Sequence, residues 1–133
     1  CFAPTRWSTL NLSRLELLFV LAEEDLVAVK TLAHAFLLPI QHGGGSNIKT
    51  AEALYSGKYV IGSEAAFRGF QPFTQLPEVT IARNPSQFQH AMRSVLQRDP
   101  LSPLPVSPTD IRYTLRWDQC LLSVPVSVAN LNR

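Results

Sequence analysis

The stretch PIQHGGGSNIKTAEALYSG, residues 39–57, decides the predicted fold. An apolar run, AFLLPI (35–40), leads into three consecutive glycines and then into a helix-like segment that carries Lys49 and Glu52. A continuous apolar run of this length is typical of a strand buried on both faces, as in parallel sheets. Because glycine backbones and helix N-termini favour bound anions, the order of strand, glycine loop and helix predicts a site for a phosphorylated ligand.

Strand-like and helix-like segments alternate around this stretch, with a longer irregular loop at 63–76. This alternation predicts an α/β fold with a Rossmann-like parallel sheet flanked by helices. We expect strands at 15–21, 35–40, 58–62 and 78–82, and helices at 23–33, 46–56 and 85–98.

The helix ends carry local signals. Acidic residues at 23–25 and a basic Lys30 match the dipole of the helix predicted at 23–33. Asn84 and Pro85 are typical of a helix cap and a first helical position.

The C-terminal part predicts a proline-rich linker at 100–108 and a closing helix at 109–124. Residues of this helix that share one face are Tyr113, Trp117, Cys120 and Val124. We interpret residues 1–133 as a single, partial domain.

Composition narrows the class of function. The chain is 46% hydrophobic and 17% charged, which indicates a globular protein. Its net charge of +2 comes from scattered Lys and Arg, so we expect no nucleic-acid partner. Cys1 and Cys120 are too far apart for a disulfide framework or a metal-ligand pattern, and we expect a reduced, cytoplasmic protein without a metal. Peripheral association with a membrane stays open.

Two general phosphate motifs fit the glycine loop poorly. The P-loop pattern G-x-x-x-x-G-K-[ST] nearly matches residues 43–50, but Ile48 replaces the second glycine. The same residue breaks the dinucleotide pattern G-x-G-x-x-G. A P-loop-like nucleotide-binding protein is therefore the less favoured functional alternative. The glycine loop is alternatively a flexible connector between strand and helix that binds no ligand.

Lys49 and Glu52 each allow two interpretations. If Ser46 caps the helix, Lys49 occupies its third position, where a glutamate or glutamine would complete a capping box. Lys49 at that position would either contact a phosphate or form an ion pair with Glu52. Glu52 suits hydrogen bonds from ribose hydroxyls, or is simply solvated.

Segment 36–70 resembles the donor-binding core of GT-B fold glycosyltransferases. In that family a strand ending in Pro is followed by a Gly-rich loop, a helix, a second strand and a loop with Arg-Gly. The resemblance covers about residues 15–122, including Trp117. The residues that carry its core are Pro39, Gly43–Gly45, Lys49, Glu52-Ala53-Leu54, Ser56-Gly57, Tyr59–Gly62 and Arg68-Gly69.

The resemblance implies a nucleotide-sugar site without a metal or other cofactor. Glu52 would bind the ribose, and the diphosphate would face the loop and helix start. The implied substrate-binding residues are Gly43, Gly44, Gly45, Ser46, Asn47, Lys49 and Glu52. Many members carry a second glutamate where this chain has Gly44, although a Gly-rich, Lys-bearing subgroup also lacks it.

We therefore expect a fragment of a glycosyltransferase that transfers a sugar from a nucleotide-diphosphate sugar to an acceptor hydroxyl. The N-terminal acceptor domain and the first βαβ part of the donor domain are absent from this chain, so it is not expected to catalyse transfer alone. No general base is assignable, and His42 beside the loop is not assigned a role. A non-catalytic interaction module is the alternative from another class.

Overall fold

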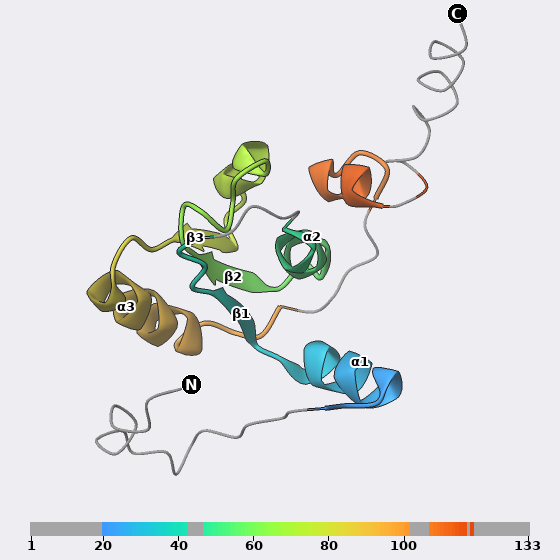
Figure 1. Ribbon diagram of the computed structural model, residues 1–133, viewed down its shortest axis with the longest axis horizontal. Coiled ribbons are helices and arrows are strands. Elements are labelled where there is room, and N and C mark those ends of the chain that lie inside the picture. Colours follow the sequence, from blue (N-terminus) through green and yellow to red (C-terminus); the bar gives the residue numbers. More distant parts are fainter. Residues whose placement is uncertain (1–19, 43–46, 102–106, 117, 119–133) are drawn as a thin grey trace, which may run out of the picture. The chain divides into compact units, whose positions relative to one another are not determined.

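The computed structural model of the chain describes residues 20–42, 47–101, 107–116 and 118 (Figure 1). The chain divides into two compact units, Cys1–Ala33 and His34–Arg133. We describe each unit by itself.

In the first unit, helix α1 spans Glu23–Leu32, as the sequence predicted to within one residue. Glu23, Glu24 and Asp25 lie in its first turn and Lys30 in its last, so charges of both signs complement the helix dipole. None of the residues of α1 is buried.

The second unit contains a parallel three-stranded sheet in the order β1-β2-β3. The strands are β1 (Ala35–Leu38), β2 (Tyr59–Gly62) and β3 (Val79–Ile81). In the register, Phe36 pairs with Val60, which in turn pairs with Val79. The three predicted strands of this unit are confirmed, and the chain is an α/β protein with a small parallel sheet.

Helices α2 (Ile48–Tyr55) and α3 (Pro85–Leu96) follow β1 and β3 in the chain, and pack on opposite faces of the sheet (Figure 1). Because side chains alternate along a strand, β2 serves two cores. Val60 packs on the α2 side with Leu54, while Tyr59 and Ile61 pack on the α3 side with Val95. Every residue of β2 is buried, as expected for a strand covered on both faces.

The predicted start of α3 is confirmed in detail. The Asn84 side chain accepts a hydrogen bond of 2.9 Å from the backbone N–H of Gln87, and Pro85 is the first helical residue. This cap satisfies one of the N–H groups that a helix start leaves without a partner.

Two predicted boundaries around the organising stretch need correction. Helix α2 begins at Ile48 with Asn47 in the N-cap position, rather than at residue 46. The segment 63–76, predicted as irregular, contains the 3-10 helix η3 (Gln71–Gln75), whose Phe73 is buried in the core.

The prediction of one closing helix over 109–124 is wrong for residues 109–116, although Asp118, the other described residue of this range, is helical. The structure has a short 3-10 helix, η4 (Ile111–Leu115), and Arg116 is already extended, with φ −69° and ψ 138°. Leu115 packs against the core on the α2 side.

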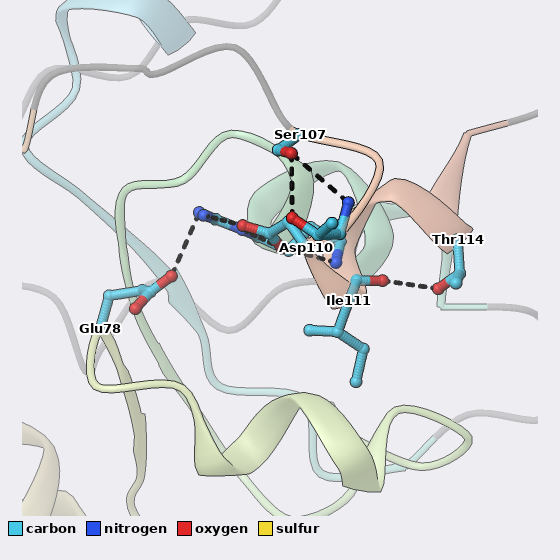
Figure 2. Close-up of polar contacts among 7 residues, drawn as sticks. Glu78, Ser107, Asp110, Ile111 and Thr114 are labelled. Atoms are coloured by element: carbon cyan, nitrogen blue, oxygen red, sulfur yellow. Dashed lines mark hydrogen bonds and ion pairs between the residues drawn. The ribbon is translucent and has the colours of Figure 1, made fainter.

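An ion-pair cluster that includes Glu78 and Asp110 anchors η4 (Figure 2). The Arg112 guanidinium bonds both carboxylate oxygens of Asp110, with Nη2 and Oδ2 2.6 Å apart, and reaches Glu78 with Nη1 and Oε1 3.2 Å apart. It also lies against Gly57, whose φ is +69°, so closely that a Cβ there would be 2.9 Å from Nη1. The cluster thus ties η4 to the end of α2 and the start of β3.

The same cluster shifts two proton equilibria. Hydrogen bonds and attraction from Arg112 lower the pKa of Asp110 from its ordinary value, against a smaller effect of burial. The Asp110 carboxylate in turn raises the pKa of Arg112.

Several predictions fall outside the described residues. These are most of the strand expected at 15–21, the centre of the linker at 100–108, and the closing helix beyond Arg116 apart from Asp118. Val20 and Leu21, the described end of the first of these, are not in a strand.

Candidate functional site

The carboxyl ends of the three parallel strands meet at one edge of the sheet, and the chain is hollowed there. This carboxyl-edge hollow has a volume of about 380 Å³. Open α/β sheets characteristically bind ligands at this edge, outside the strand ends. The hollow is lined by Ile40, Gln41, His42, Ser63, Glu64, Ala65 and Arg83.

The hollow adjoins the chain just before the predicted glycine loop, where His42 lines it. Asn47, at the start of α2, is not among the lining residues. Gly43, Gly44, Gly45 and Ser46, four of the predicted site residues, lie outside the described residues.

Hydrogen bonds fix the wall that the hollow shares with β1 and β2. The Ser63 N–H donates to the Leu38 carbonyl at 3.1 Å, and the Ser63 hydroxyl donates to the Ile40 carbonyl. The same hydroxyl accepts from the Ala66 N–H at 3.2 Å. Ser63 therefore joins the segments that leave two neighbouring strands.

Asn47 uses its side chain to attach the start of α2 to the segment after β2. Its amide nitrogen donates to the carbonyls of Ala65, Ala66 and Arg68 at 3.2, 3.1 and 3.4 Å. Because Ala65 also lines the hollow, these bonds set the position of the first turn of α2 beside it. The side-chain amide nitrogen of this predicted site residue is thus occupied by structural contacts.

Thr50 makes a second attachment from the same turn. It is fully buried, and its hydroxyl donates to the Ala66 carbonyl at 2.8 Å. In the P-loop pattern the residue at this place offers its hydroxyl to Mg²⁺, which requires access to the ligand. The burial of Thr50 argues against that alternative.

Lys49 and Glu52 lie exposed on α2. With Asn47 as the N-cap, Lys49 is the second helical residue and not the third, so the capping-box position belongs to Thr50. Lys49 therefore lies in the first turn, where N–H groups lack intrahelical acceptors and point at any bound anion.

None of the residues that line the hollow was among the site residues predicted from the sequence. Ser63, Glu64 and Arg83 closely follow the ends of β2 and β3, and this position after parallel strands was the signal available. Arg83 and Glu64 form an ion pair of 2.8 Å with side chains exposed by 64% and 63%. At such exposure the pair is worth less than about 1 kcal/mol, so a charged ligand could displace either partner at low cost.

Among the described residues, no group of three or more His, Cys, Asp or Glu side chains is placed to hold a metal ion. Nor does any helix in that part of the chain have the length and apolar character needed to cross a bilayer.

No family model, curated protein or solved structure matches this chain. The resemblance to GT-B glycosyltransferases consequently depends on the motif residues quoted above.

Proposed function

We propose that this chain is part of the donor-binding, Rossmann-like domain of a cytoplasmic GT-B glycosyltransferase. The whole enzyme would transfer a sugar from a nucleotide-diphosphate sugar to an acceptor hydroxyl. The observation that carries the proposal is the carboxyl-edge hollow, which lies at the ends of the three strands and includes Ala65, to which Asn47 at the start of α2 is bonded. The lining segments 40–42 and 63–65 fall within the stretch 36–70 that resembles the family.

The diphosphate would be held by the start of α2 and by Lys49. N–H groups of a first helical turn and a lysine ammonium both stabilise negative charge, and they do so more strongly as a diphosphate leaves with its full charge. Asn47 and Thr50 keep this turn in place through their bonds to the Ala65–Arg68 segment. In this proposal the chain supplies charge stabilisation without a resident metal.

Glu52 would accept hydrogen bonds from the ribose. It lies one turn further along α2 than Lys49, so a nucleotide running along the helix meets the lysine with its phosphates and the glutamate with its sugar. Glu52 is exposed, so a ribose can reach its carboxylate oxygens, which are hydrogen-bond acceptors.

The transfer step itself needs more than this chain. The acceptor hydroxyl, a general base and the further basic phosphate contacts would come from the N-terminal acceptor domain and the remaining part of the donor domain. Those domains and the nucleotide-diphosphate sugar are the proposed partners, and nucleic acid is not among them.

Thermal unfolding of the 133-residue chain with UDP and with GDP tests the proposal. Binding to the folded state alone raises stability by about 2.7 kcal/mol at one hundred times Kd, which corresponds to a rise in Tm of several degrees. We expect one of the two nucleotides to raise the Tm, and Glu52→Ala to reduce that rise. Glu24→Ala on α1 is the matched control and should leave it unchanged.

If neither nucleotide changes the Tm and Glu52→Ala matches the control, the donor-site proposal is wrong. The non-catalytic module would then be the better account. A rise that appears only with ATP and Mg²⁺ would instead favour the P-loop-like alternative.

A further inference from the structure

The outer edge of β3 offers backbone groups for pairing. The Val60 N–H donates to the Glu78 carbonyl at 2.9 Å, and the Ala82 N–H donates to the Gly62 carbonyl at 2.8 Å. In a parallel ladder every second residue bonds to the same neighbour, so the N–H and C=O of Ile81 point away from β2. Within the described part of the chain, β3 is the last strand on this side of the sheet.

A second hollow runs along this edge, between β3 and α3. This β3-edge groove has a volume of about 520 Å³, larger than the carboxyl-edge hollow. Thr80 and Ile81 form the strand wall, and one face of α3 forms the other. Its lining on the helix side is Ser86, Gln87, His90, Ala91, Ser94 and Val95, with Arg83 and Arg98 at the two ends of the helix.

Of the described residues that line the groove, Arg83, His90 and Arg98 are basic and none is a carboxylate. Arg83, His90 and Arg98 are all exposed. The guanidinium of Arg98 is steadied above the Tyr59 ring, 5.7 Å from its centroid. Glu64, which is not part of this lining, pairs with Arg83. Among the described residues, Arg98 forms no ion pair.

We propose that the β3-edge groove binds an extended, acidic peptide segment, which pairs with β3 as an added strand. An exposed sheet edge supplies main-chain hydrogen bonds to such a segment, and the flanking side chains decide which sequence is accepted. Here the flanking side chains are cations and short polar groups, so the accepted segment carries Asp or Glu facing α3.

The alternation of side chains along a strand makes the proposal more specific. His90 lies on α3, and Arg98 lies just beyond the end of this helix, so the two residues line different parts of the groove. Four residues of an extended strand cover about 13 Å and return to the same face. Two acidic residues four positions apart therefore both face α3, whereas two that are three apart point to opposite faces.

Peptide binding to the full 133-residue chain tests this inference by fluorescence anisotropy. The probe is a labelled nine-residue threonine peptide with two glutamates four positions apart. Its comparison peptides have the glutamates three positions apart, lysines in their place, or methylated backbone nitrogens along the edge that would pair. We expect the first peptide to bind about tenfold more tightly than each comparison.

Variants of the chain locate the binding. Arg98→Glu should weaken it about tenfold, while the matched control Arg93→Glu, a reversal on α3 outside the groove lining, should leave it within about twofold. Binding of the lysine peptide or the methylated peptide as tightly as the first peptide, or equal loss in both variants, would overturn the proposal. Sedimentation of a dimer that the peptide fails to dissociate would also overturn it, because a second copy would then occupy the edge. None of these outcomes depends on nucleotide binding.

Discussion

Thr50 shows how a single residue separates two functional hypotheses. From the sequence it is the final residue of a near match to the P-loop pattern, and its hydroxyl would be a metal ligand. In the structure it is fully buried and bonded to the Ala66 carbonyl, so the hydroxyl serves the fold. Asn47 acts in the same way, and together they fix the turn that the donor-site proposal uses.

We predict that Thr50→Val destabilises the chain by about 1 kcal/mol, because valine keeps the shape and removes the buried donor. The cost stays near this value since the Ala66 carbonyl retains its bond of 3.1 Å from Asn47. Urea unfolding measures the difference. Thr31→Val is the control, since its hydroxyl bonds to Val27 on the exposed surface of α1. Equal stability of the two variants would contradict the structural role of Thr50.

Helices and strands with a strong local sequence pattern could be predicted. Elements whose form depends on tertiary contacts could not. The neighbouring residues Asn84 and Pro85 predict the start of α3, and the apolar run of β2 predicts a strand that is buried on both faces. In η4 the local pattern favoured a long helix, but Arg112 bonds Asp110 beside it and Glu78 far away in the sequence. A rule based on neighbouring residues in the sequence cannot predict this contact between Arg112 and Glu78.

The Asp110–Arg112 pair makes a prediction about pH. Because the folded-state pKa of Asp110 is lowered, its contribution is fully present above the unfolded-state value of about 3.9 and is lost as the pH falls below it. Asp110→Asn should therefore be less stable than the natural chain by about 1–2 kcal/mol at pH 7, with the difference shrinking below about pH 4.

Urea unfolding at pH 7 and near pH 3 measures this dependence. Asp118→Asn is the matched control, because its ion pair with Arg116 has side chains exposed by 55% and 42% and is largely screened. A stability difference for Asp110→Asn that is the same at both pH values would show that the carboxylate charge is not the cause.

For the whole molecule, the parallel α/β order could be predicted, whereas none of the predicted site residues lines the carboxyl-edge hollow. The glycine stretch pointed to the end of β1, and the carboxyl-edge hollow lies there. Glu64 and Arg83 were missed because they lie close together only through the pairing of β2 with β3. The sequence alone does not predict that pairing. The β3-edge groove was missed for a related reason, since it depends on which strand lies at the edge.

The central claim is that the carboxyl-edge hollow and the first turn of α2 bind a nucleoside diphosphate. Titration of the isotope-labelled 133-residue chain with UDP and GDP, followed by NMR, tests it most directly. The account predicts that one nucleotide shifts the backbone signals of His42, Ser63, Lys49 and Glu52 in a saturable manner, and leaves those of His90 and Ser94 in place. Unchanged signals at the first four residues, or shifts confined to the β3-edge groove, would contradict it.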